Sequence, residues 1–375
     1  MVHLLAAQPD QNHSIAGLYI HIPFCRVKCR FCAFAAYPGR LADVPRYLEA
    51  LRKDIASLTP VRLDTLYFGG GTPTLLSPAD WRLLIKSIRD VFPIAEGPEV
   101  SVECNPDDAS PELLSVLRDL GVNRLSVGLQ STQDHHLRTL GRLHDYARFE
   151  RAWTDARAAG FTNLNIDLMY GLPGQTMDEW KETLDRALAL GSEHLSAYAL
   201  TVEEKTAFRF RNVEPDDDLQ ADMYETLSDR MEGAGFLHYE ISNFAKPGFE
   251  CRHNLKYWRN ENCLGAGVSA AWFWDGVRRK NTENLTDYME ALEKNISPVL
   301  ETVKLSEPEQ VGESVMLGLR TRDGARLTGR AEAIYGDVLR RHAAQGLLKM
   351  TPDRVFPTRR GWLLSNRVFV DLLEG

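Results

Sequence analysis

The chain has 375 residues, 44% of them hydrophobic and 26% charged, and its formal net charge is −8 at pH 7. This composition is typical of a globular protein and argues against a nucleic-acid-binding protein, which usually carries excess positive charge. No apolar stretch is long enough to span a membrane, and residues 1–15 lack the pattern of a secretory signal. Six cysteines do not indicate a disulfide scaffold, so we expect a cytoplasmic protein.

Predicted strands and helices alternate after an N-terminal tail, residues 1–16, that is expected to be frayed. The strands expected from short apolar runs are 18–22, 63–68, 100–103, 124–128, 163–169 and 194–200, with a seventh candidate at 238–241. The helices expected between them are 44–58, one capped by Ser77, one from Ser110, two stretches beside Gly141, 178–190 and 219–234. This alternation predicts an α/β fold with a parallel sheet, and the strand count predicts an incomplete (β/α)6 barrel.

A domain boundary is expected in residues 298–309, which mix proline and acidic residues without a clear period. The predicted regions are therefore a barrel with its extension, 17–300, and a C-terminal domain, 306–375. The second region contains expected helices at 313–322, 328–335 and 336–345 and a hairpin at 347–358, which together predict a small winged-helix-like domain. Its basic cluster, Arg340 and Arg341, is too small for a DNA-recognition helix, so we expect no nucleic-acid partner.

Three cysteines, Cys25, Cys29 and Cys32, follow the first predicted strand at spacings of four and three residues. Thiolates are the usual ligands of iron–sulfur clusters, and three of them leave one iron of a four-iron cluster open to a small molecule. A structural zinc knuckle is the alternative, but zinc sites usually include a second pair of Cys or His. No compact second pair follows, so the spacing favours an iron–sulfur cluster.

Polar residues gather at the ends of the predicted strands, where the active sites of parallel barrels form. They are Gly69–Pro73, Glu103 with Asn105, Gln130, Asp167 with Tyr170, and Thr201. Each has a local alternative role: a tight turn for the glycines, a helix cap for Glu103 and a loop hydrogen bond for Asp167. Together with the cysteines they predict one polar cofactor bound across the barrel mouth.

Five sequence strings resemble the HemN/HemW branch of the radical S-adenosylmethionine (SAM) proteins over nearly the whole chain from Leu18. They are Tyr-x-His-Ile-Pro-Phe-Cys-x3-Cys-x2-Cys, Gly-Gly-Gly-Thr-Pro, Ser-Val-Glu-Cys-Asn-Pro, Ser-Val-Gly-Leu-Gln-Ser and Asn-Ile-Asp-Leu-Met-Tyr-Gly-Leu-Pro. The resemblance implies a radical SAM barrel that holds a 4Fe-4S cluster on the three cysteines. It also implies that SAM chelates the open iron and is cleaved to a 5′-deoxyadenosyl radical by an electron from the cluster.

The resemblance assigns roles to particular residues. Tyr19 and Phe31 are implied to touch SAM and the cluster, and Thr201 to lie at the adenine side. The positions implied around the rest of SAM are Gly70, Gly71 and Thr72 at the methionine part, and Glu103, Gln130, Arg142 and Asp167 at the amino, ribose and carboxylate groups. Backbone N–H groups in a glycine segment suit a carboxylate because no side chain blocks its approach.

Two classes of this branch fit the sequence. One is oxygen-independent coproporphyrinogen III oxidase (HemN), which decarboxylates propionate side chains; the other is HemW, a haem-binding class thought to deliver haem to membrane haemoproteins. The HemW class is favoured because Phe34 stands where the oxidase has a further cysteine, because only 24 residues precede Cys25, and because a His-Asn-x-x-Tyr-Trp signature begins at His253. We expect a haem chaperone; the alternative is the oxidase or another radical SAM enzyme such as a methyltransferase.

The signature also has a direct chemical interpretation. His253 is a candidate ligand of haem iron, Tyr257 and Trp258 offer flat faces to a porphyrin, and Asn254 can orient the imidazole or meet a propionate. A packed aromatic corner is the alternative, and Cys251 is either a second iron ligand or a core residue. The resemblance further implies haem-accepting membrane partners, such as respiratory-chain components, and a reductant for the cluster. It leaves a homodimer and peripheral membrane contact open.

Overall fold

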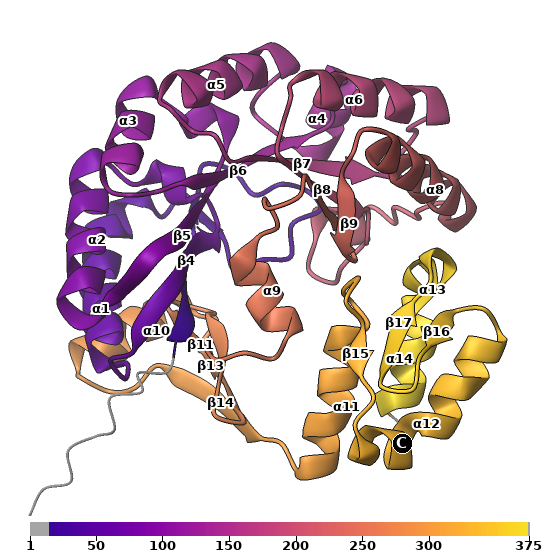
Figure 1. Ribbon diagram of the computed structural model, residues 1–375. Coiled ribbons are helices and arrows are strands. Elements are labelled where there is room, and N and C mark those ends of the chain that lie inside the picture. The colour runs from indigo at the N-terminus through magenta and orange to yellow at the C-terminus, as the bar shows by residue number, and fades with distance from the viewer. Residues whose placement is uncertain (1–14, 374–375) are drawn as a thin grey trace, which may run out of the picture.

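The computed structural model describes residues 15–373 and contains the six parallel strands expected from the sequence. They are β1 (Ile15–Ile22), β4 (Arg62–Gly70), β5 (Ile94–Cys104), β6 (Arg124–Gln130), β7 (Leu164–Tyr170) and β8 (His194–Ala199). They are hydrogen-bonded in chain order, each parallel to the next, and form a strongly curved sheet (Figure 1). The expected (β/α)6 partial barrel is confirmed. Of the tail expected at residues 1–16, residues 1–14 lie outside the described part, and Ile15 and Ala16 belong to β1, so the expected boundary is two residues too late.

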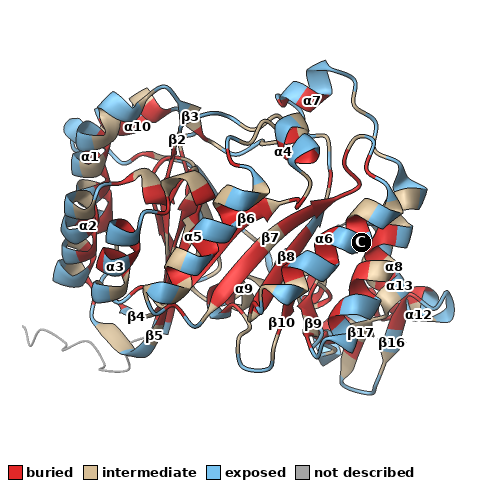
Figure 2. Ribbon diagram, turned by 90° about the horizontal axis from the view of Figure 1, so that it is seen from above, coloured by how far each residue is buried: buried red, intermediate tan, exposed pale blue. Residues whose placement is uncertain are grey.

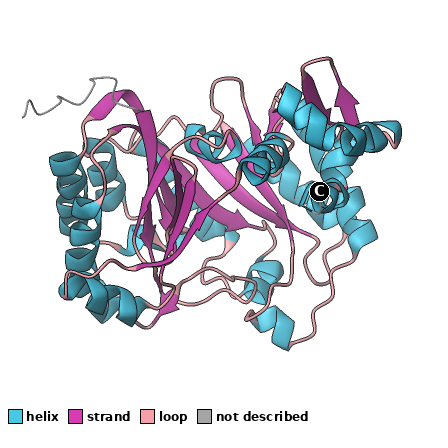
Figure 3. Ribbon diagram, turned by 90° about the horizontal axis from the view of Figure 1, so that it is seen from below, coloured by secondary structure: helices cyan, strands magenta, loops and turns pink. Residues whose placement is uncertain are grey.

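Helices cover the convex face of this sheet, as Figures 1 and 3 show. They are α1 (Val44–Ser57), α2 (Pro78–Val91), α3 (Pro111–Asp119), α4 (Asp134–Leu140), α5 (Tyr146–Ala158), α6 (Met177–Ala189) and α8 (Asp217–Gly233). The short α7 (Ala207–Phe210) instead contacts the loop that contains Arg30, since the Phe208 N–H donates to Arg30 O at 3.0 Å. The predicted cap of α2 is present: Ser77 and Asp80 form a reciprocal capping box. A second capping box, Thr176 with Glu179, begins α6.

The two faces of the sheet differ in chemistry, because side chains alternate along each strand. Apolar side chains such as Phe68 and Val102 point outward and form the main hydrophobic core with the helices. The inward-facing positions are mostly polar. The register aligns them in rows: Tyr67 lies opposite Tyr19 and Ser101, Glu103 opposite Ser126, and Asp167 opposite Ser196. The strands of the sheet are largely buried (Figure 2), and the serines of these rows are among the buried residues, so the barrel interior is polar rather than a second apolar core.

Both edges of the sheet differ from the prediction. The seventh candidate strand exists as β9 (Leu237–Glu240), but it pairs antiparallel with β10 (Asn243–Ala245), which returns antiparallel along β8. At the other edge β11 (Cys263–Ala266) runs parallel to β1 and leads into an antiparallel meander that the sequence did not predict. Its members are β12 (Ala271–Trp274), β13 (Val277–Asn281), helix α10 (Leu285–Glu293) and β14 (Val299–Lys304). The segment interpreted as an irregular boundary therefore contains an edge strand.

Helix α9 (Arg252–Trp258) lies within the concave side of the sheet (Figure 1). Its start is fixed by Glu99 of β5, whose carboxylate accepts hydrogen bonds from the backbone N–H groups of Arg252 and His253 at 2.9 and 3.0 Å. A carboxylate at a helix N-terminus satisfies N–H groups that have no intrahelical partner and interacts favourably with the helix dipole. The His-Asn-x-x-Tyr-Trp signature is thereby placed on a helix inside the barrel.

The C-terminal part has its own hydrophobic cluster, which includes Leu339 and Val355. Its elements are α11 (Glu307–Gly318), β15 (Ala325–Arg326), α12 (Gly329–Ala344), β16 (Leu348–Met350), β17 (Arg354–Pro357), α13 (Arg359–Leu363) and α14 (Ser365–Leu373). The expected hairpin is present as β16 and β17, and β15 joins it as a third strand. The two helices expected at 328–345 form one continuous helix, α12, which passes through Gly336. Among residues 15–373, no helix combines the length and apolar character needed to cross a membrane.

Candidate functional site

The three clustered cysteines lie on one loop, between the short parallel strands β2 (Phe24–Cys25) and β3 (Tyr37–Pro38). Cys25, Cys29 and Cys32 are free, half-buried, and line a cavity of about 550 Å³ at the C-terminal ends of the barrel strands. Thr72 Oγ1 lies 3.4 Å from Cys25 Sγ, and Arg142 Nη1 lies 3.6 Å from Cys29 Sγ. Burial raises the pKa of Cys25 to about 11, so its thiolate needs a positive partner such as iron.

The spacing of these thiols bears on which metal they fit. A tetrahedral zinc site with Zn–S bonds of about 2.3 Å brings its sulfur atoms to roughly 3.8 Å from one another. In the part of the chain that the structure describes, the three cysteine sulfurs do not all come within 4.8 Å of one another. In a cluster each thiolate binds a different iron, so the three sulfur atoms need not approach one another this closely.

The glycine segment at the end of β4 lines the same cavity, but its backbone N–H groups are already used. Gly70 donates to Glu103 at 3.0 Å, Gly71 to Ile22 O at 2.8 Å and Thr72 to Phe24 O at 2.8 Å. The predicted cradle of free N–H groups for a carboxylate is therefore not formed. The glycines have a packing role instead, since a Cβ on Gly70 would lie 2.4 Å from the His21 ring and one on Gly71 2.7 Å from Phe24 O.

Two half-buried carboxylates face the cavity, Glu103 from β5 and Asp167 from β7, with β6 between these strands. Glu103 accepts hydrogen bonds from Tyr67 Oη and from the Gly70 N–H, both at 3.0 Å. Burial, followed by the nearby charge of Asp167, raises the pKa of Glu103 to about 7. Asp167 accepts hydrogen bonds from Ser126 and from Asn165 Nδ2, the latter at 2.8 Å. These carboxylates can accept hydrogen bonds from an ammonium or from ribose hydroxyls.

Arg142 connects the two sides of the cavity. Its Nη2 donates to Asn105 Oδ1 at 2.7 Å and to Gly128 O at 2.9 Å, while Nη1 faces Cys29. Asn105 in turn donates to Thr72 Oγ1 at 2.7 Å. The fixed guanidinium places a positive charge beside the cysteine loop, where thiolates would carry negative charge.

Most of the predicted SAM and cluster residues share this one cavity. Those that line it are Cys25, Cys29, Phe31, Cys32, Gly70, Gly71, Thr72, Glu103, Gln130, Arg142, Asp167 and Thr201. Gln130 ends β6 with a positive φ of 72°, an uncommon conformation for a residue other than glycine. Tyr19 does not line this cavity. Its ring stacks on Tyr67, and its hydroxyl lies 3.0 Å from His21 Nδ1.

A second cavity, of about 860 Å³, adjoins the first and extends to α9. It is lined by Tyr19, His21, His253, Asn254 and Tyr257, among others. Both cavities share the lining residues Ala33, Phe34, Tyr67, Glu103, Tyr198 and Glu203. The volume lies within the range of pockets for small molecules and cofactors, roughly 300–1,000 Å³.

His253 occupies the inner wall of the second cavity. It is only 1% exposed, with Nδ1 2.9 Å from Thr65 Oγ1 and Nε2 3.2 Å from Tyr257 Oη, and its ring stacks on Tyr67. Burial lowers the pKa of His253 to about 3, so the imidazole is neutral at pH 7, as iron ligation requires. With its proton on Nδ1, the ring donates to Thr65 and keeps the Nε2 lone pair on the Tyr257 side.

The structure does not bring every haem candidate to this wall. Trp258 lines neither cavity; its ring lies beneath the guanidinium of Arg320, 5.4 Å away. Cys251 is fully buried, with Sγ 3.5 Å from Glu99 Oε1, and also lines neither cavity. Asn254 and Tyr257 remain beside His253 at the cavity.

Sequence analysis missed three residues that the structure places in the site. Thr65 orients His253, Tyr67 lies in the wall of both cavities, and Tyr198 is shared by both. Thr65 and Tyr67 alternate with the apolar residues of β4, so a period-two pattern inside the run 63–68 was the available signal.

Comparisons with known proteins show which proteins the chain resembles. Residues 19–187 match the profile of the Radical SAM superfamily, and residues 305–364 match the HemN C-terminal domain. The chain is 39% identical to "Heme chaperone HemW" of Bacillus subtilis, covering 94% of this chain and 97% of that protein. It is 40% identical to the protein of the same name from Mycobacterium tuberculosis H37Rv, covering 98% and 97%. Among solved structures, coproporphyrinogen III oxidase (HemN) of Escherichia coli superposes with a TM-score of 0.84 at 26% identity, covering 96% of this chain and 90% of that one.

Proposed function

The chain belongs to the HemW family of the radical SAM superfamily, and from this premise we propose that it is a haem chaperone that holds a 4Fe-4S cluster, SAM and haem. The observation that carries the proposal is the 39–40% sequence identity to proteins named as haem chaperones, over nearly the full length of each pair of compared chains. The arrangement of the site supports it, because one barrel contains two adjoining cavities with different linings.

The first cavity would hold the cluster and SAM. Cys25, Cys29 and Cys32 would bind three irons, and Arg142 would offset the negative charge of the thiolates. When bound, the cluster supplies an electron for the reduction of SAM. The residues proposed to hold SAM are Phe31, Gly70, Gly71, Thr72, Glu103, Gln130, Asp167 and Thr201. Among them, the carboxylates of Glu103 and Asp167 can accept hydrogen bonds from the amino and ribose groups of SAM.

The second cavity would hold haem, with His253 as the iron ligand. The Nε2 atom reaches iron once the Tyr257 hydroxyl moves aside, while the Thr65 hydroxyl keeps the ring oriented through Nδ1. Tyr257 and Tyr19 offer ring faces or edges to a porphyrin, and Asn254 offers an amide to a propionate. Trp258 would act from outside the cavity, by packing α9 against the C-terminal part.

The chaperone would pass haem to acceptor proteins such as membrane-bound respiratory components, and a cellular reductant would reduce the cluster. An oxygen-sensitive cluster and half-buried free thiols suit the reducing cytoplasm, with transient contact at the membrane surface where an acceptor lies.

Coproporphyrinogen III oxidase activity is the second candidate, favoured by the structural likeness to HemN over 96% of the chain. Phe34 argues against it, since this exposed aromatic side chain lies in the wall of both cavities at the position of the oxidase's further cysteine.

One preparation can test both functions. The anaerobically reconstituted full chain is incubated either with haem and an apo-haemoprotein acceptor or with coproporphyrinogen III, SAM, a reductant for the cluster and an electron acceptor for the decarboxylation. The chaperone proposal predicts transfer of haem to the acceptor and no release of CO2. Release of CO2 with formation of protoporphyrinogen would instead establish the oxidase, and absence of haem binding would reject the chaperone.

A further inference from the structure

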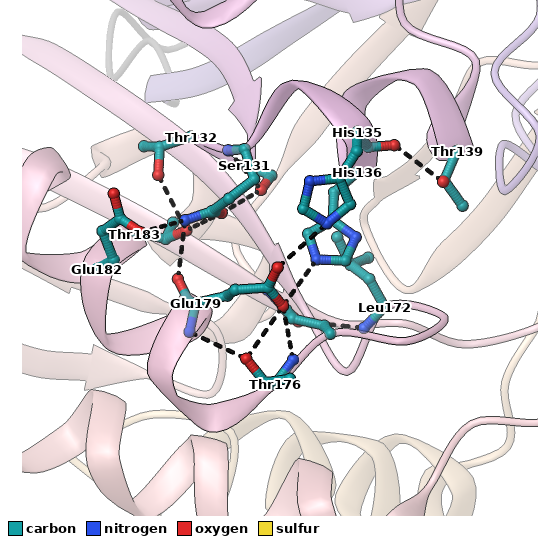
Figure 4. Close-up of polar contacts among 12 residues, drawn as sticks. Ser131, Thr132, His135, His136, Thr139, Leu172, Thr176, Glu179, Glu182 and Thr183 are labelled. Atoms are coloured by element: carbon teal, nitrogen blue, oxygen red, sulfur yellow. Dashed lines mark hydrogen bonds and ion pairs between the residues drawn. The ribbon is translucent and has the colours of Figure 1, made fainter.

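A second group of metal-binding side chains lies outside the barrel mouth, between α4 and α6 (Figure 4). His135 and His136, in the first turn of α4, both face Glu179 in the first turn of α6. His135 Nε2 lies 3.1 Å from Glu179 Oε1, and His136 Nε2 lies 3.3 Å from Oε2. Two imidazoles and one carboxylate therefore converge on a single point.

The donor set selects a class of metal ion. The three ligand atoms all lie within 4.8 Å of one another, which allows one ion to contact all three after small side-chain adjustments. Imidazole nitrogens combined with one carboxylate oxygen suit zinc and similar first-row divalent ions, whereas calcium and magnesium prefer oxygen-only sites. Three protein ligands leave the fourth tetrahedral position for water.

The local structure holds these ligands in place before any ion binds. Glu179 is fixed by its capping box, because Oε2 accepts hydrogen bonds from the Thr176 N–H at 2.8 Å and the Thr176 hydroxyl at 3.1 Å. This bond leaves Oε1 directed at His135 (Figure 4). The two imidazole rings lie with their centroids 4.0 Å apart.

The two histidines differ in exposure in a way that suits capture of an ion. The side chain of His136 is 1% exposed, which fixes its position, whereas that of His135 is 54% exposed and leaves an entry path.

We infer that His135, His136 and Glu179 form a zinc-class divalent metal site that joins α4 to α6. Helix α4 is also the support of the cysteine loop: Leu140 O at its C-terminal end accepts a hydrogen bond from the Arg30 N–H at 2.9 Å. The Arg30 guanidinium also donates to Thr139 O at 3.0 Å. An ion at the start of α4 thus fixes the helix against which the cysteine loop rests.

The test is a zinc titration by calorimetry on the full chain carrying serine at Cys25, Cys29 and Cys32, so that those thiols do not compete. In this background, His136→Gln and Glu179→Gln should each weaken the binding of one equivalent of zinc by at least tenfold. Gln at position 179 can still serve the capping box, so loss of binding there reports the missing charge and not a broken helix cap.

Two matched controls belong to the same series. Glu182→Gln removes a nearby exposed carboxylate from the same helix, and His342→Gln removes a buried histidine paired with Asp371 at 2.9 Å in the C-terminal part. Both should bind zinc as the parent does. If the parent binds no zinc, or if a His135→Gln, His136→Gln double variant binds it equally well, the site does not exist.

A second measurement removes the dependence on the serine background. The cluster-loaded wild-type chain is melted anaerobically with and without zinc, beside the His135→Gln, His136→Gln double variant. An ion that binds only the folded state should raise the melting temperature of the wild type alone. An equal rise in both proteins, or none in either, would overturn the assignment.

Discussion

Replacing Tyr67 by Phe should weaken SAM binding at neutral pH while the haem site stays intact. Tyr67 Oη donates one of the two hydrogen bonds, each 3.0 Å long, that stabilise the Glu103 carboxylate in the barrel interior. The substitution removes that hydroxyl but keeps the ring, which stacks on Tyr19 and His253. The effect therefore acts on the charge of Glu103 and not on packing.

The expected size follows from the pKa of Glu103, which burial has already raised to about 7. A hydrogen bond to a charged group is worth roughly 1.5–3 kcal/mol, and one pKa unit corresponds to about 1.4 kcal/mol, so its loss raises this pKa by about one to two units. The ionised fraction at pH 7 then falls from about one half to roughly 1–10%. If the carboxylate of Glu103 binds the SAM ammonium, the affinity of the variant should be about 5- to 50-fold below that of the wild type at pH 7, and this ratio should shrink as the pH rises toward 9.

Calorimetric titration of SAM into cluster-loaded protein, from pH 6.5 to 9, measures this profile. Tyr257→Phe is the matched control, since it removes the hydroxyl that contacts His253 and leaves Glu103 untouched. It should keep the wild-type SAM profile and alter the haem spectrum instead. An unchanged pH profile of SAM affinity in Tyr67→Phe would refute the role assigned to Glu103.

Three further outcomes are expected. Cys25→Ala should abolish the cluster, as measured by anaerobic counting of iron and sulfide. Cys104→Ala, which alters a buried residue, should retain it, and equal cluster content in the two variants would contradict the assignment. His253→Ala should change the haem absorption spectrum or abolish binding, whereas Trp258→Ala, outside the cavity, should mainly lower thermal stability; an unchanged spectrum in His253→Ala would remove this ligand. Burial raises the pKa of Glu240 to about 8, above its unfolded value, so this group's stabilising contribution is lost as pH rises from about 4.5 to 8. The unfolding free energy of Glu240→Gln, measured by chemical denaturation, should depend less on pH over that range, and an identical slope in both proteins would contradict this.

The sequence determined the parallel half of the fold and the cysteine loop because both are local signals. Each of the six parallel strands is a short apolar run bounded by turns, and their alternation with helices leaves few possible topologies. Since such strands all end at one edge, residues such as Glu103 and Asp167 could be assigned to a common site before their positions were known. The ligand roles of the residues gathered there remain predictions.

Only the tertiary structure decided which residues face the second cavity. Strand β11 lies beside β1 through long-range pairing such as Gly17 with Cys263, which no local pattern encodes, and the meander follows from it. The signature residues are separated by helix geometry: His253 and Tyr257, four positions apart, share one face of α9. Trp258 is rotated by about 140° from His253 at 100° per residue and so points to Arg320. The sequence determined the chemistry of the signature, and the docking of α9 inside the barrel determined which of its side chains can meet a ligand.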